Sequence, residues 1–297
     1  MACYFGARLA RSGATRVTLA GTWREGLDAV ATRGIHVEDG DGAWAVRVYA
    51  APLAEAPVAA LSLVLTKSQK TTAVAPAVAR AVGDAGIALS LQNGLGNREA
   101  LESCVRPGAV LAGVTMAGAT LLGPGHVRGH DAPTILGRDE AGRAHEVAAL
   151  FHEAGFQAEV SPNIEAVLWR KLVVNSAINP LSALKGVPNG ALVENPEWRG
   201  VLEEAAREAA TVAAARGIDV GNDPVEAALE VARLTAANRS SMLQDLERGA
   251  PTEIDAINGM VVREGARLGV PTPVNRRLLD EIRAREEALG TRHGASS

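Results

Sequence analysis

Residues 165–180 read EAVLWRKLVVNSAINP, and their spacing sets the organisation that we predict for the whole chain. A helix advances about 100° per residue, so positions three or four apart lie on one side of it. The side chains on one such stripe are Leu168, Lys171, Leu172, Asn175 and Asn179. A helix that faced solvent would place its polar groups opposite its leucines. Here the polar groups fall within the apolar face.

Two interpretations of this stripe compete. An unpaired amide or ammonium in apolar surroundings is costly, so the stripe could be a buried hydrogen-bond network, or a lysine whose stem packs while its head reaches water. The other interpretation is a polar site with apolar walls. We favour the site, because three polar side chains share the stripe and Pro180 is expected to end the helix directly after them.

The composition fits a protein of about two domains, since the chain has 297 residues. It is 47% hydrophobic and only 3% aromatic, which suits an α/β core with helices packed through small residues. The formal net charge is −4 and no basic stripe alternates with aromatic residues, so nucleic acid is not an expected partner.

No apolar run reaches the ~20 residues that span a bilayer, and the N-terminus lacks the pattern of a signal peptide. We therefore expect no membrane partner. Cys3 and Cys104 form neither a metal-binding cluster nor a disulfide framework. We therefore expect the protein to lie in the reducing cytoplasm and to bind no metal.

The N-terminal residues match half of a dinucleotide-binding unit. Residues 2–13 (ACYFGARLARSG) predict a helix that ends at Gly13, and residues 15–21 (TRVTLAG) a buried strand. Such a βαβ unit normally opens with a strand and G-x-G-x-x-G/A, whose glycines admit a pyrophosphate to the helix N-terminus. Ala2 stands at the third position of that motif, while the first strand and first glycines are missing.

Two explanations of that missing strand are open. If the start codon is assigned late, we expect the DNA upstream of Met1 to encode an apolar strand followed by Gly-x-Gly. If the loss is real, a weakened or inactive enzyme is expected. Under either explanation, the residues given leave a neighbouring strand of the sheet unpaired.

Thr22 and Arg24 follow the second predicted strand, and no acidic residue precedes Glu25. An acid at this place binds the ribose 2′-hydroxyl of NAD, whereas hydroxyl and arginine donors suit the 2′-phosphate of NADP. The sequence thus favours NADP (NADPH when reduced), although Arg24 could equally be a solvated loop charge.

Further strands are predicted along the first half. Residues 43–50 (AWAVRVYA) alternate like an exposed hairpin strand, while residues 58–71 and 87–97 each begin as a strand buried on both faces. Ligands of open α/β sheets bind beyond the carboxyl ends of the strands. Lys67 and Asn93 stand there, so both are candidate contacts. The alternatives are a surface charge and an ordinary Asn-Gly turn.

The first domain is predicted to end near Pro162. Before that boundary, residues 110–138 predict two or three antiparallel strands and residues 145–156 a helix. After it, the chain is predicted to be helical. The domains are a Rossmann-like NADP-binding domain (1–162), an all-helical substrate and catalytic domain (163–291) and a tail (292–297). The helices predicted after the boundary stretch are 198–217, 224–249, 253–269 (capped by Thr252 and Asp255) and 276–289.

Four segments resemble ketopantoate reductases (2-dehydropantoate 2-reductases). They are LWRKLVVNSAINPLSAL (168–184), NRSSMLQDLERGAPTEIDAING (238–259), TKSQKT (66–71) and LQNGLGN (91–97). The resemblance covers nearly the whole chain. It implies a Rossmann domain, a helical domain and a site between them. It also implies NADPH-dependent reduction of 2-dehydropantoate to (R)-pantoate, on the route to pantothenate and coenzyme A.

The resemblance assigns catalysis to Lys171 and Glu253. Lys171 matches the lysine that hydrogen-bonds the ketone oxygen, where hydride transfer leaves an alkoxide that an ammonium can stabilise and protonate. Lysine suits this task because its pKa responds to desolvation and to neighbours. Glu253 matches an acid that contacts the lysine or substrate and also borders the cofactor. From the residues alone, Glu253 could be a first-turn acid favoured by the helix dipole.

The resemblance also assigns binding roles. The residues that match substrate contacts are Asn93, Asn175, Asn179, Asn238 and Ser241. Asn238 and Ser241 are expected on one helix face, because they lie three residues apart. The expected cofactor contacts are Lys67, Asn93 and Glu253, together with Ala2, Thr22 and Arg24 from the dinucleotide-binding pattern.

Three functions remain open. The first is the reductase just described, acting on a small 2-oxo acid. The second is a relative that reduces another branched 2-oxo acid, since the pocket walls set substrate choice. The third is a nucleotide-binding homologue that has lost chemistry, which the missing glycine loop favours and the presence of Lys171 and Glu253 opposes. The oligomeric state is open, a homodimer included.

Overall fold

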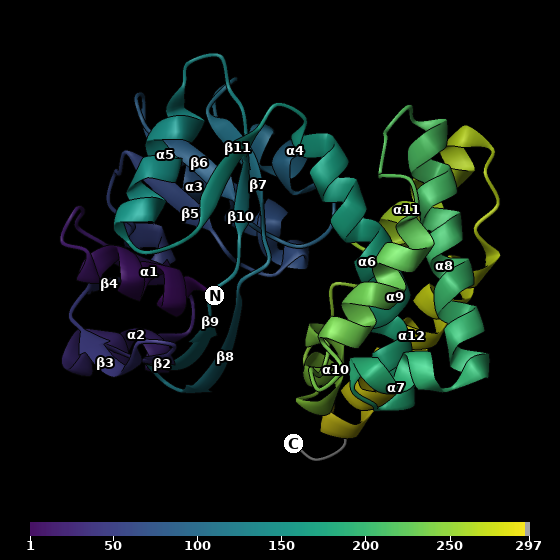
Figure 1. The fold of residues 1–297 in the computed structure, drawn as a ribbon. Coiled ribbons are helices and arrows are strands. Elements are labelled where there is room, and N and C mark those ends of the chain that lie inside the picture. Colours follow the sequence, from purple (N-terminus) through teal and green to yellow (C-terminus); the bar gives the residue numbers. More distant parts are fainter. Residues whose placement is uncertain (295–297) are drawn as a thin grey trace. The chain divides into compact units, whose positions relative to one another are not determined.

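The computed structural model describes residues 1–294 and divides into two compact units (Figure 1). The first contains Met1–Gln92 and Asn97–Ile164, and the second contains Asn93–Gly96 and the chain from Glu165 onward. The first unit is mixed α/β and the second is helical, which confirms the predicted Rossmann-like fold with a C-terminal helical domain. No helix among the described residues has the length and apolar character to span a membrane.

The first unit contains all the strands of the described chain. The strands are β1 (Thr18–Gly21), β2 (Ile35–Asp39), β3 (Gly42–Val46), β4 (Tyr49–Pro52), β5 (Leu61–Val64), β6 (Ile87–Ser90), β7 (Val110–Thr115), β8 (Gly118–Gly123), β9 (His126–His130), β10 (Thr134–Gly137) and β11 (Ala158–Ser161). Its helices are α1 (Ala2–Arg11), α2 (Arg24–Arg33), α3 (Thr71–Val82), α4 (Asn97–Glu102) and α5 (Arg143–Glu153).

A five-stranded sheet forms the centre of this unit, in the order β11-β10-β7-β6-β5. Strands β5, β6 and β7 are parallel, and β10 runs antiparallel to β7. Side chains alternate between the faces, so Ala88 and Val110 pack against α3 and α4, while Leu89 and Leu111 join the cluster formed with α1 and α5. Helices therefore cover both faces, which explains why β6 and β7 are fully buried.

Strands β1 and β5 are less buried than the sequence predicts. Every residue of β1 and three of the four in β5 are only half-buried. Within residues 1–294, β1 pairs only with β4 and β5 only with β6, so each keeps one open edge. The predictions of a buried strand in residues 15–21 and of a strand buried on both faces in residues 58–71 are therefore wrong. The expected unpaired edge in the sheet is present.

The segment 43–50 is not one hairpin strand. Strand β3 pairs antiparallel with β2, but the backbone N–H of Tyr49 donates to the carbonyl of Val17 at 3.1 Å, and β4 then runs parallel to β1. The chain thus changes partner between Val46 and Tyr49. Residues 110–138 likewise form four strands, β7 to β10, where two or three were predicted.

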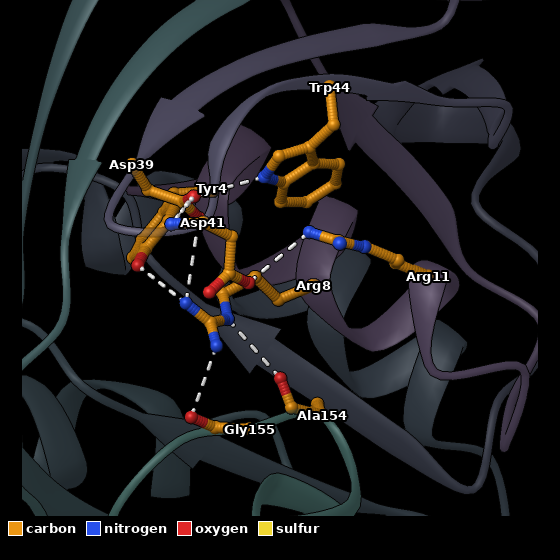
Figure 2. A network of polar contacts seen from close by, with 8 residues as sticks. All are labelled: Tyr4, Arg8, Arg11, Asp39, Asp41, Trp44, Ala154 and Gly155. Atoms are coloured by element: carbon orange, nitrogen blue, oxygen red, sulfur yellow. Dashed lines mark hydrogen bonds and ion pairs between the residues drawn. The ribbon is translucent and has the colours of Figure 1, made fainter.

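Arg8 joins three parts of the first unit (Figure 2). Its guanidinium donates to the carbonyls of Ala154 and Gly155 at 3.2 and 3.1 Å and to the Tyr4 hydroxyl at 3.1 Å. It also forms an ion pair with Asp39, whose side chain is 1% exposed. Helix α1 is thereby fixed to β2 and to the end of α5.

The second unit is built around one long helix. The helices are α6 (Ile164–Lys185), α7 (Asn189–Glu194), α8 (Pro196–Ala215), α9 (Pro224–Leu234), α10 (Ser241–Glu247), α11 (Asn258–Leu268) and α12 (Pro273–Gly294). Pro180 does not end α6, contrary to the prediction; it lies inside the helix. The carbonyl of Ser176, which proline deprives of its usual donor, accepts a 2.9 Å hydrogen bond from the Asn258 side chain.

Other predicted helix limits also need correction. The expected helix 224–249 is two helices, because the chain leaves α9 at Thr235 and Ser240 caps α10 by accepting from the N–H of Leu243. The helix predicted from residue 253 begins at Asn258: Thr252 accepts from the N–H of Ile254 and so caps only a turn. In the predicted tail, residues 292–294 are helical, and 295–297 lie outside the described residues.

We expect Arg8→Met to lower the free energy of unfolding by about 2 kcal/mol, because it leaves buried Asp39 without its cation and two carbonyls without donors. Arg11→Met is the matched control: Arg11 pairs with exposed Asp41, so its loss should cost less than about 0.5 kcal/mol. Urea unfolding measures both. Equal effects of the two variants would contradict the role of Arg8.

Candidate functional site

Lys171 projects from the middle of α6 and is half-buried. Burial lowers the pKa of its amine from 10.5 to about 8, and the nearby Glu253 carboxylate partly offsets this by raising it. Desolvation disfavours the charged amine, while the opposite charge favours it. At neutral pH the side chain is therefore mainly an ammonium that can give up its proton readily.

Glu253 is buried, with 7% of its surface exposed, in a turn that precedes α11. One of its oxygens, Oε2, accepts a hydrogen bond from the Asn93 side-chain amide at 3.0 Å. A buried carboxylate needs such partners to stay charged. The sequence alternative for Glu253, a first-turn acid of a helix, is excluded because the turn ends before α11 begins.

The loop Asn93–Gly96 packs against that same turn. The N–H of Leu95 donates to the carbonyl of Ala256 at 3.1 Å. Gly94 has φ +78°, and a Cβ there would lie 2.4 Å from the Ala256 carbonyl oxygen. Only glycine fits both the conformation and the close approach. The Asn-Gly pair is therefore required for the Asn93 amide to reach Glu253.

Asn175 and Asn179 follow Lys171 along α6; Asn175 is half-buried and Asn179 is buried. The carbonyl of Asn179 accepts from the Ser240 hydroxyl at 3.3 Å. This bond links α6 to the segment that carries Asn238 and Ser241, both of which are exposed.

The prediction that Asn238 and Ser241 share a helix face is wrong. Asn238 lies in the loop after α9, while Ser241 is the first residue of α10. The loop is fixed there because the N–H of Asn189 donates to the carbonyl of Asn238 at 3.0 Å.

The residues assigned to the cofactor in the first unit lie after strands β1 and β5. Thr22 and Arg24 are exposed, at the turn after β1 and the first position of α2. Ala2 begins α1, and half-buried Lys67 follows β5. Lys67 lies near the start of α1, since its charge adds to burial in lowering the pKa of the Met1 amine. These hydroxyl and cationic donors fit an anionic dinucleotide.

Three buried residues around the candidate site were not predicted from the sequence: Asn189, Ser240 and Asn258. Asn189 supports the Asn238 loop, Ser240 joins that loop to Asn179, and Asn258 bonds Ser176. Only Ser240 had a recognisable signal, because serine before an apolar pair is a typical N-cap. The roles of the two asparagines depend on contacts between distant segments.

A Rossmann-like first unit, followed by a helical unit with polar residues around Lys171, is typical of a two-domain oxidoreductase. Residues 1–139 match the family described as "Ketopantoate reductase PanE/ApbA", and residues 163–286 match "Ketopantoate reductase PanE/ApbA C terminal". A 2-dehydropantoate 2-reductase of Archaeoglobus fulgidus is 42% identical over 77% of both chains, and one of Halobacterium salinarum is 39% identical over 91% of both.

Solved structures agree with these matches. The crystal structure of a PanE/ApbA family ketopantoate reductase from Ralstonia eutropha has a TM-score of 0.91, with 34% identity over 97% of this chain and 96% of that one. A D-mandelate dehydrogenase with NADH and anilino(oxo)acetate has a TM-score of 0.89 and 25% identity, covering 97% and 96%. The chain belongs to the ketopantoate reductase family.

We expect Glu253→Gln to move the pKa of Lys171 below about 8, because it removes the charge that raises this pKa. Asp255→Asn is the control, since exposed Asp255 pairs with Arg283 instead. NMR titration of labelled lysine amines measures both, with the Lys171→Met spectrum providing the assignment. An unchanged titration in Glu253→Gln would show that the carboxylate does not act on the amine.

Proposed function

We propose that this protein reduces 2-dehydropantoate to (R)-pantoate with NADPH, as a step toward pantothenate and coenzyme A. The observation that carries the proposal is Lys171, whose amine has a pKa lowered to about 8 beside buried Glu253. Membership of the ketopantoate reductase family supports the choice of substrate.

Lys171 performs the acid step of the proposed reaction. Its ammonium donates a hydrogen bond to the ketone oxygen, stabilises the negative charge that develops there and then transfers a proton to it. An acid with a pKa near 8 is protonated at neutral pH and is a much stronger donor than an ordinary lysine. When bound, the reduced nicotinamide supplies the hydride. Glu253 keeps the amine protonated and is itself oriented by Asn93.

The amides and hydroxyls of the second unit bind the substrate in this proposal. Asn175 and Asn179 lie on the face of α6 that carries Lys171, and they suit the hydroxyl and carboxylate groups of a small hydroxylated acid. Asn238 and Ser241 add a second set of polar groups, connected to Asn179 through Ser240.

A different 2-oxo acid is the second candidate substrate, because one similar solved structure is a D-mandelate dehydrogenase. The comparison of kcat/KM for 2-dehydropantoate and 2-oxoisovalerate separates the two. We expect 2-dehydropantoate to be favoured, since polar side chains built to bond a hydroxyl discriminate strongly against an analogue that lacks it. Equal or better use of 2-oxoisovalerate would overturn our choice.

We expect Lys171→Met to reduce kcat by about 10²–10⁴-fold, because the substitution removes the proton donor and the charge that stabilises the alkoxide. Lys185→Met, at the end of the same helix, is the control and should keep wild-type kcat. Stopped-flow or steady-state loss of NADPH absorbance measures both. Undiminished reduction by Lys171→Met would eliminate the mechanism.

The preference for NADPH is tested at Arg24. We expect Arg24→Ala to lower kcat/KM for NADPH by about tenfold, through loss of a charge-assisted bond to the 2′-phosphate, and to leave NADH unaffected. Arg33→Ala, in the last turn of α2, is the control. The similar D-mandelate dehydrogenase holds NADH, so a wild-type preference for NADH would refute our assignment. Failure to bind either cofactor would favour the homologue without chemistry.

A further inference from the structure

We infer that Asn258 is a positioning residue, which ties α6 to the turn carrying Glu253 and so holds Glu253 in place beside Lys171. Its bond to Ser176 replaces the one that Pro180 removes from α6. The inference deepens the proposed function and rests on it for its catalytic consequence, but the structural coupling can be measured without substrate.

The coupling begins at Pro180. A proline inside a helix has no N–H for the carbonyl four residues earlier, and its ring crowds that carbonyl. The carbonyl here belongs to Ser176, a residue with no exposed surface, so water cannot supply the missing donor. A buried carbonyl left without a partner costs free energy, and α6 needs a donor from another element.

Asn258 supplies that donor. Its Nδ2 lies 2.9 Å from the Ser176 carbonyl oxygen and 2.9 Å from Oδ1 of Asn275, so both amide hydrogens are used. Its own Oδ1 is buried and has no partner in the described part of the chain. The orientation of this amide therefore depends on the two bonds that it donates.

Asn275 is itself held firmly at the start of α12. Its Nδ2 donates to the carbonyl of Ala205 at 3.0 Å and to Glu208 at 2.8 Å. The Glu208 carboxylate also accepts from the N–H groups of Val274 and Asn275 at 2.8 and 2.9 Å. Asn258 thus connects α6 to a buried polar cluster fixed to α8 and α12.

A turn directly before Asn258 connects it to Glu253. The carbonyl of Glu253 accepts from the N–H groups of Ala256 and Ile257, both at 3.1 Å, which makes a compact turn ending at Asn258. Ser176 lies five residues beyond Lys171, about 7.5 Å along the helix axis. The hydrogen bond from Asn258 to Ser176 therefore joins α6, which carries Lys171, to the end of the turn that carries Glu253.

The test is a double-mutant cycle between Asn258→Leu and Pro180→Ala. An alanine at position 180 restores a backbone N–H for the Ser176 carbonyl, so the Asn258 bond becomes redundant and the two positions should not act independently. We expect Asn258→Leu to lower kcat about ten- to a hundredfold, as misplacement by about 1 Å can do. In the Pro180→Ala background, Asn258→Leu should lower kcat by a factor that is several-fold smaller. Losses that multiply would overturn the inference.

Titration of the Lys171 amine separates positioning from loss of stability. Asn258→Leu should shift this titration to lower pH, because Glu253 moves away from the amine, and Pro180→Ala should shift it part of the way in the same direction. The control is Thr134→Val, which removes a buried hydrogen bond to Thr115 in the first unit and should lower stability without moving the titration. An unshifted titration in folded Asn258→Leu or Pro180→Ala would refute positioning.

The two proposals fail separately. The titration and the unfolding equilibria need no substrate, so a wild-type protein that does not reduce 2-dehydropantoate would end the proposed function and leave the coupling intact. If Asn258→Leu does not fold, Pro180→Ala alone carries the test, since alanine is favourable within a helix.

Discussion

The chemistry that we propose for the second unit depends on the electrostatic balance at the amine of Lys171. Taking the ammonium of Lys171 partly out of water costs free energy, and the charge of Glu253 repays only part of that cost, so the pKa stays near 8. A more solvated lysine would be a poor acid at neutral pH, and without the glutamate the pKa of the lysine would lie below about 8. The interaction is useful only if the distance between the two groups is well controlled.

Much of the surrounding structure supplies that control. Asn93 bonds the glutamate directly, and Gly94 lets the loop approach the turn closely enough for the bond to form. Ser240 fixes the carbonyl of Asn179, and Asn258 fixes the carbonyl of Ser176. Both carbonyls lie within the four residues before Pro180, so this part of α6 is bonded to two other segments of the second unit.

Helical spacing in the sequence predicts α6 and the helical second unit, and the βαβ pattern together with the resemblance predicts the fold class. Helical spacing was not enough to predict helix limits that depend on partners from elsewhere. Pro180 looked like a helix end because its replacement donor, Asn258, lies far away in sequence. The sequence places Asn238 and Ser241 on one helix because the bond from Asn189, which holds Asn238 in a loop, leaves no local pattern. Likewise, the apolar composition of β1 and β5 did not show that most of their residues are only half-buried.

The lowered basicity of Lys171 has a further chemical consequence. At pH 7 about one tenth of such amines carry a lone pair, compared with less than a thousandth for a lysine in water. The side chain is therefore a latent nucleophile, which can condense with a carbonyl compound to give an imine. By holding most of the population in the cationic form, the neighbouring carboxylate limits this side reaction.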